Sequence, residues 1–250
     1  METERMTLIQ HLTELRKRLL WVLVIMAAGM GICYLFVDQI YDFLVAPLAD
    51  AMGPYDSRRL IYTGLTEAFF TSLKVTFFAG VFITFPFLLW QIWLFIAPGL
   101  YKTERNAFLP FLVATPALFF LGGACLYYLV LPMALPFFLS FQTTPAETAL
   151  PIQLEARVSE YLNLLMTLIF SFGLCFEMPV LLALMGKTGM ITAETLSRQR
   201  RYAIVIIFVV AAILTPPDIL SQVLLAVPLL LLYELSIILV RHVQKPAKPV

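Results

Sequence analysis

Long stretches of this chain carry no Asp, Glu, Lys or Arg. The uncharged runs are residues 19–37, 75–101, 107–146, 161–176, 202–217 and 219–233. A bilayer core about 30 Å thick needs roughly 20 apolar helical residues to cross it. The pattern predicts an all-α, polytopic membrane protein, a single membrane domain over residues 1–250 with six transmembrane helices. The predicted spans are approximately 19–37, 68–96, 107–132, 159–185, 202–216 and 219–240.

Leucines recur at helical spacing just before the first run, at Leu8, Leu12, Leu15 and Leu19. Polar residues occupy the other faces of this stretch, which is typical of a short amphipathic helix lying on the membrane surface. The apolar run that follows shows no small-residue cleavage pattern. We therefore expect it to be retained as the first span and not removed as a secretory signal.

Basic residues fall in four clusters, and the positive-inside rule places all four in the cytoplasm. The clusters are Arg5/Arg16/Lys17/Arg18, Lys102/Arg105, Lys187/Arg198/Arg200/Arg201 and Arg241/Lys245/Lys248. Both termini are then cytoplasmic, and residues 38–67 are external. An even number of crossings must separate Arg105 from Lys187. One of these crossings follows Tyr161, so the run 107–146 crosses once. We expect Pro132, Pro136 and residues 142–145 to lie in an external loop.

Span length and proline content predict helices of unequal shape. The 14 residues from Tyr202 to Thr215 make only about 21 Å of helix, which favours local thinning of the bilayer. Prolines inside spans kink helices, and neighbouring groups in a membrane can satisfy the freed carbonyls. The sequence thus predicts a concave assembly of kinked helices. The prolines concerned are Pro86, Pro110, Pro116, Pro179 and Pro228.

Composition excludes an ordinary soluble domain. Hydrophobic residues make up 61% of the chain and charged residues 13%, against about half and a quarter in soluble proteins. The 17 basic and 16 acidic residues nearly balance, so charge gives no case for a nucleic-acid partner. Cys33, Cys125 and Cys175 lie in apolar runs without metal-ligand spacing and are interpreted as small buried side chains.

Catalytic motifs are absent from the sequence. The two histidines, His11 and His242, form no HExxH pair, and there is no GxSxG elbow or phosphate-binding loop. We therefore expect no enzyme activity, cofactor or metal. Charges inside membranes are functional candidates, and here they are Lys74, Glu177 and Glu234. For Glu177, a functional group and a helix-packing hydrogen bond both remain open.

Two carboxylates stand beside basic residues at the predicted cytoplasmic surface: Glu14 before Arg16, and Glu104 beside Arg105. Four strings place these and other residues in a wider pattern: HLTELRKRL at 11–19, WLFIAPGLYKTER at 93–105, FGLCFEMP at 172–179 and LTPPDILSQ at 214–222. In order and in spacing, they resemble the TatC family, the receptor subunit of the twin-arginine protein translocase. The resemblance implies export of folded proteins across the bacterial cytoplasmic (inner) membrane, driven by the proton motive force.

The resemblance also implies which residues act. Glu14 and Glu104 would accept hydrogen bonds from the two consecutive arginines of a signal peptide, since guanidinium forks match carboxylates. Arg16 would orient or neutralise these carboxylates, Arg105 would belong to the same binding site, and Phe95 and Leu100 would form an apolar shoulder. Glu177 would be a polar anchor for the signal's apolar segment. The single-span subunits TatA and TatB would dock at Thr215 and Gln222, and self-association is expected. The remaining family positions are Pro47, Pro98, Gly99, Tyr101, Pro216, Pro217 and Asp218.

Composition alone leaves two alternatives. A proton-coupled small-solute secondary transporter also uses broken helices and an intramembrane carboxylate, although such transporters usually show repeated halves, which this chain lacks. A membrane assembly factor without transport activity is the other alternative.

Overall fold

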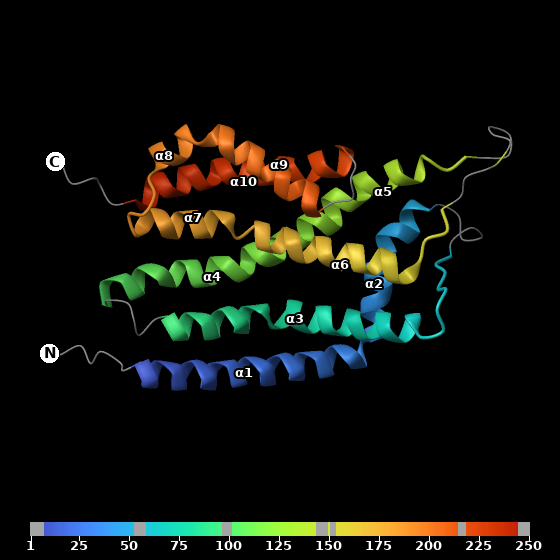
Figure 1. Cartoon of the computed structure of the whole chain (residues 1–250), viewed down its shortest axis with the longest axis horizontal. Coiled ribbons are helices and arrows are strands. Elements are labelled where there is room, and N and C mark those ends of the chain that lie inside the picture. The colour runs from blue at the N-terminus through green and yellow to red at the C-terminus, as the bar shows by residue number, and fades with distance from the viewer. Residues whose placement is uncertain are drawn as a thin grey trace. The chain divides into compact units, whose positions relative to one another are not determined.

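The computed structural model of the protein is almost entirely helical (Figure 1). It describes residues 8–52, 59–96, 102–143, 150, 154–214 and 219–244. Within these ranges the extended segments form only an isolated bridge between Ile61 and Arg157. The chain divides into two compact units: the first unit is Met1–Tyr41 with Ser72–Pro116, and the second unit is Asp42–Thr71 with Ala117–Val250.

Five described helical segments are long and apolar enough to cross a membrane. They are Leu12–Leu35, Glu67–Ile92, Pro110–Leu139, Val158–Lys187 and Gln222–Val243. These segments correspond to five of the six predicted spans, and the prediction of an all-α, multi-pass membrane protein is confirmed. The remaining predicted span corresponds to α9 (Arg200–Leu214), which has 15 residues. The count of six spans and the concave shape stay predictions.

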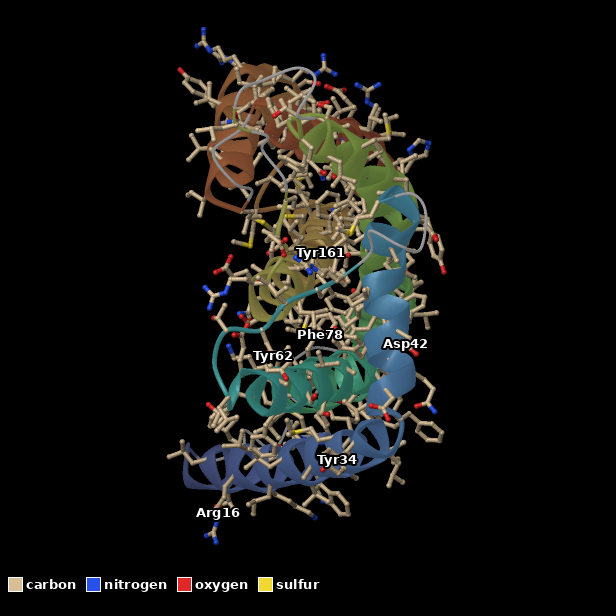
Figure 2. All side chains as sticks on the ribbon, turned by 90° about the vertical axis from the view of Figure 1, so that its right-hand side faces the viewer. Arg16, Tyr34, Asp42, Tyr62, Phe78 and Tyr161 are labelled. Carbon is tan, nitrogen blue, oxygen red and sulfur yellow. The ribbon has the colours of Figure 1, made fainter. Side chains whose placement is uncertain are left out.

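The first unit is built on α1 (Leu8–Leu35) and on α3 (Glu67–Ile96) from Ser72 onward, and these two helices lie side by side and antiparallel (Figures 1 and 2). Their backbones approach closely at Gly29 and Gly80. A Cβ added at Gly29 would lie 2.5 Å from Thr84 Cγ2, and one added at Gly80 would lie 2.7 Å from Met30 Cγ. Small residues permit this approach, as is common between membrane helices.

α1 corrects one expectation. The leucine pattern at 8–19 predicted a separate surface helix, but the structure has one continuous helix from Leu8 to Leu35. The physical reason is that this stretch contains no proline, and its glycines come only in the last turns. Nothing therefore breaks the hydrogen-bond ladder where the charged residues end and the apolar span begins.

The second unit holds most of the buried core. Its helices include α6 (Val158–Cys175), α7 (Met178–Lys187), α8 (Ala193–Arg198), α9 and α10 (Ile219–Val243), and α10 packs along α7 and α9 (Figure 1). The last part of α4 (Lys102–Cys125) packs tightly on α6. A Cβ added at Gly122 would lie only 2.6 Å from the carbonyl oxygen of Phe172.

The sequence pattern did not indicate the helix α2 (Val37–Ala51), which contains Pro47. Proline has no N–H, so the carbonyl of Phe43, four residues earlier, lacks its intrahelical donor. The hydroxyl of Tyr127 donates to this carbonyl at 2.5 Å, and the Tyr127 and Phe43 rings stack with centroids 4.4 Å apart. The hydroxyl of Tyr161 donates to the next carbonyl, Leu44, at 3.1 Å. Pro47 thus creates an acceptor that attaches α2 to the rest of the second unit.

The predicted external loop beginning at Pro132 is wrong. After α4, the chain forms a π-helical turn, η3 (Leu126–Val130), and continues as α5 (Leu131–Leu139) through Pro132 and Pro136. Pro132 follows directly on the π-helical turn, where the regular α-helical hydrogen-bond ladder is already interrupted, so the helix continues through it. Gln142 and Thr143 are non-helical, as expected. Residues 144 and 145 lie outside the described residues.

The kink predicted at Pro179 is confirmed as a break between α6 and α7. Phe176 and Glu177 form a turn, and Pro179 lies in the first turn of α7. By contrast, α3 runs unbroken through Pro86 and α10 through Pro228.

A polar cluster, the Glu67 clasp, joins the segments that precede α3 and α6. Ile61 exchanges two backbone hydrogen bonds of 3.0 Å with Ala156 and Val158. Glu67 accepts hydrogen bonds from the Ser159 hydroxyl at 2.5 Å and from the Thr63 amide at 2.8 Å. Both carboxylate oxygens of Glu67 are therefore engaged.

Candidate functional site

The clearest candidate site lies in the first unit, at the charged end of α1. Glu14 is only 17% exposed in its side chain, and its Oε1 atom accepts hydrogen bonds from Arg18 Nε at 3.0 Å and from Arg18 Nη2. Arg18 also donates to Gln91 Oε1 on α3 at 3.4 Å. The i,i+4 spacing places the two charged residues on one face of the helix. Arg18 therefore fixes the position of the Glu14 carboxylate beside α3.

The second oxygen of Glu14 has a different environment. Oε2 is buried and accepts no hydrogen bond from the part of the chain that the structure describes. A buried acceptor without a donor is costly, and more so when it is charged. A ligand that brings N–H donors would relieve this cost. A guanidinium is suited to the task, because it is planar, permanently charged and carries donors in a fork.

Arg16 is placed differently from Arg18. Its side chain is exposed and points away from α3 (Figure 2). The predicted role of Arg16 in orienting the carboxylates is untested and stays a prediction. The ion pair with Glu14 is made by Arg18, which sequence reasoning counted only among the basic residues. The i,i+4 spacing from Glu14 was the signal that could have found it.

The other residues predicted for this site are only partly described. Phe95 lies in the last turn of α3, and Glu104 and Arg105 lie in the first turn of α4, but the structure describes only their backbones. Pro98, Gly99, Leu100 and Tyr101 lie outside the described residues. Five residues separate the end of α3 from the start of α4, and the Arg18–Gln91 contact brings α1 beside the last turns of α3.

The predicted residues of the second unit are not brought together with this site by any described contact. Glu177 is 8% exposed and immediately precedes α7. Gln222 on α10 donates from Nε2 to the carbonyl of Phe208 on α9, at 3.0 Å. Thr215, Pro216, Pro217 and Asp218 lie outside the described residues.

The three candidate intramembrane charges, Lys74, Glu177 and Glu234, differ in how deeply they are buried. Glu234 pairs with Arg200 at 2.8 Å, and both side chains are half-exposed. Lys74 is exposed. Among the described residues, Glu177 alone is both charged and buried. Burial of a carboxylate in a span is expensive, which keeps Glu177 as a candidate for function.

Comparison with known proteins gives a consistent result. The sequence profile of the "Sec-independent protein translocase protein (TatC)" family matches residues 10–228. The Sec-independent protein translocase protein TatC of Magnetococcus marinus is 49% identical over 242 residues, covering 97% of this chain and 86% of the relative. The protein of the same name from Rickettsia prowazekii is 45% identical, covering 95% and 93%. A crystal structure of a twin-arginine translocase receptor TatC superimposes with a TM-score of 0.76 at 39% identity, covering 93% of this chain and 99% of that one.

The apolar helical spans are those of a multi-pass membrane protein, and the matched family and relatives assign it to the protein-translocation class. Within that class, the chain belongs to the TatC family. It is a component of the twin-arginine translocation system and not an enzyme. Family membership also decides against the small-solute transporter alternative.

Proposed function

We propose that this protein is the signal-peptide receptor of its translocase, and that it binds the two consecutive arginines of a signal peptide through Glu14 and Glu104. The observation that carries the proposal is the Glu14 carboxylate, whose one oxygen is held by Arg18 while the other is buried and accepts no hydrogen bond from a described residue. Arg18 in this arrangement orients the carboxylate without occupying it fully.

Two carboxylates suit two arginines for energetic and geometric reasons. Each hydrogen bond to a charged group contributes roughly 1.5–3 kcal/mol. Arginine can bind a carboxylate through two parallel N–H donors, whereas lysine presents a point charge. Arg16 and Arg105 would balance the local negative charge, and Phe95 and Leu100 would contact the apolar residues that follow the arginines.

The proposal includes an orientation. Both termini face the cytoplasm of a bacterium, and six helices cross its inner membrane, with the 15-residue α9 as the fifth span. The basic clusters that follow the positive-inside rule support this arrangement. It puts Glu14 on the side where folded precursor proteins are made. Transport would be driven by the proton motive force.

Partner binding is proposed for the second unit. TatA and TatB would dock beside α9 and α10, at Thr215 and Gln222, and copies of this protein would associate in the complex. The Gln222–Phe208 hydrogen bond supports this role, because it fixes α10 against α9 at the proposed docking position. Glu177 would contact the apolar segment of the signal. Export by Glu177→Ala at the wild-type rate would instead assign Glu177 to helix packing.

The receptor role can be tested by peptide binding to the purified full chain in nanodiscs. Glu14→Gln is expected to weaken binding of an Arg-Arg signal peptide by about 10-fold or more, which corresponds to one lost charge-assisted hydrogen bond. A Lys-Lys version of the peptide should bind weakly to the wild type, and Glu14→Gln should change its binding little.

Glu194→Gln is the matched control. Glu194 is an exposed carboxylate in the first turn of α8, and hydrogen bonds from its own amide and from Thr192 hold its pKa below its usual range. Its replacement should leave peptide affinity unchanged. Equal affinity of wild type and Glu14→Gln for the Arg-Arg peptide would refute the proposed site.

A further inference from the structure

An apolar groove on the surface of the second unit has no role in the proposed function. Its volume is about 350 Å³, and it is lined by apolar side chains of α6, α7, α9 and α10, including Met178, Leu181, Met185, Ile206 and Val210. The lining residues Leu181 and Ile206 are 57% and 61% exposed, so the groove opens to the surroundings of the protein.

The size and lining of the groove favour an acyl chain as its occupant. Apolar cavities of about 150 Å³ in proteins bind molecules as large as benzene, and this groove has more than twice that volume. The lining belongs to spans, where the surrounding solvent is lipid hydrocarbon.

Positive charge lies on α9, close in sequence to the groove's lining residue Ile206. On α9, Tyr202 lies one turn before Ile206 and on the same face. The Arg201 guanidinium lies over the Tyr202 ring, 4.9 Å from its centroid, and donates to the Tyr202 hydroxyl at 3.2 Å. Arg200 is paired with Glu234, whereas Arg201 forms no ion pair with a described residue. Residues 187–201 contain four basic side chains and a single acidic one, Glu194.

Charge and groove together specify one ligand. We propose that the second unit binds an anionic phospholipid, with an acyl chain in the groove between α7 and α9 and its phosphate at Arg201. Tyrosine and arginine at this position match the headgroup level of a bilayer, where aromatic side chains and basic residues meet anionic lipid. The site uses none of the residues proposed to bind the signal peptide.

Photolabelling of the full chain in phosphatidylcholine nanodiscs tests the proposal. The probe is phosphatidylglycerol with a diazirine in its acyl chain, and the comparison probe is phosphatidylcholine with the same chain. Peptide mass spectrometry should find label on α7 and α9, about fivefold more from the anionic probe, as expected for one basic residue near the headgroup. Arg201→Gln should reduce this ratio to about one, and Arg241→Gln, an exposed arginine at the end of α10, should not.

Groove occupancy is tested separately from charge. Ile206→Trp should fill the groove and remove most of the label, while Val205→Trp, at an exposed neighbour outside the lining, should not. The unfolding temperature of both variants shows whether they are folded; if Ile206→Trp does not fold, the Arg201→Gln result decides. Equal labelling by the two probes would overturn the headgroup assignment. Absence of label from α7 and α9 would overturn the proposal and favour a side chain of a partner helix as the occupant.

Discussion

The two units differ in how they use burial. In the span of α1, only 11% of the residues in the most apolar window are buried, against 50% in the span formed by α6 and α7. The first unit is held by the close approach at Gly29 and Gly80 and by the Arg18–Gln91 contact. The second unit has a continuous core that includes Phe119, Leu162 and Phe172. Because lipid is as apolar as leucine, an exposed span carries no penalty.

The carboxylates of the two units show what this difference means. Glu67 in the second unit is surrounded by donors that engage both of its oxygens. Glu14 in the first unit has one oxygen bound to Arg18 and one buried oxygen that accepts no hydrogen bond from a described residue. A satisfied carboxylate stabilises its own fold. One that is only half satisfied is suited to bind an incoming cation.

The largest effect is expected from filling the tightest contact in the second unit. Gly122→Leu would drive its Cβ against the Phe172 carbonyl, which is backbone and cannot rotate away. We expect a loss of about 3 kcal/mol or more in unfolding free energy, measured as a lower unfolding temperature in detergent. Gly31→Leu in α1 is the control, because an added Cβ there meets no atom within 4 Å. Equal destabilisation by both variants would contradict the tighter packing at Gly122 than at Gly31.

A smaller effect separates the two carboxylates. Glu67→Gln should lower the unfolding free energy by about 2 kcal/mol, because it removes charge-assisted acceptors while leaving the donors in place. Glu14→Gln should change the unfolding free energy by less than about 1 kcal/mol, because glutamine can still accept from Arg18 and the substitution removes the charge of a buried oxygen that accepts no hydrogen bond from a described residue. Thermal unfolding of the two variants gives both values. A larger loss for Glu14→Gln would assign Glu14 a structural role.

The contact between Tyr127 and α2 predicts a non-additive pair of substitutions. Tyr127→Phe should cost about 1 kcal/mol of unfolding free energy, the usual value of one hydrogen bond. In a Pro47→Ala background the new alanine N–H can donate to the Phe43 carbonyl, so the cost of Tyr127→Phe should fall. Tyr128→Phe, at an exposed position, serves as the control. Full additivity in a double-mutant cycle would contradict the role assigned to Pro47.

The smallest effect is expected at the exposed ion pair of the second unit. Arg59 and Glu155 approach to 2.6 Å, but their side chains are 72% and 44% exposed. Surface pairs of this kind contribute about 0–1 kcal/mol, so Arg59→Gln should leave the unfolding temperature nearly unchanged. A clear fall in the unfolding temperature that grows at low salt would show that the Arg59–Glu155 pair contributes to the Glu67 clasp.

Helix identity and order followed from the sequence because uncharged runs in a membrane protein report spans directly. The sequence-based predictions failed where contacts with distant residues or the neighbouring helix geometry outweighed the local preference of a residue. Pro132 predicted a helix end, but it follows directly on the π-helical turn, and the helix continues through it. The helix α2 was missed because residues 38–67 were interpreted only as an external segment, and Tyr127, whose hydroxyl donates to the Phe43 carbonyl, lies 84 residues away from it.

The roles of the candidate site residues stay predictions. The sequence singled out Glu14 and Glu177 because charge is rare beside or within spans, and because their settings resemble family strings. The pairing of Glu14 with Arg18 was not found, because three consecutive basic residues offered several partners and only the geometry selects among them. The groove was not found, since apolar residues on a span carry no mark of which face is hollow.

The π-helical turn η3 has a consequence for how this family can vary in length. A π-turn accommodates one residue more than an α-turn, and one residue of α-helix is a rotation of about 100°. Deleting one residue from Leu126–Val130 would therefore convert the π-turn into an α-turn and leave the helix continuous, with α5 facing its neighbours almost as before. A deletion elsewhere in α4 or α5 would rotate the rest of the helix by about 100°, so relatives can lose one residue at this turn with little change in packing.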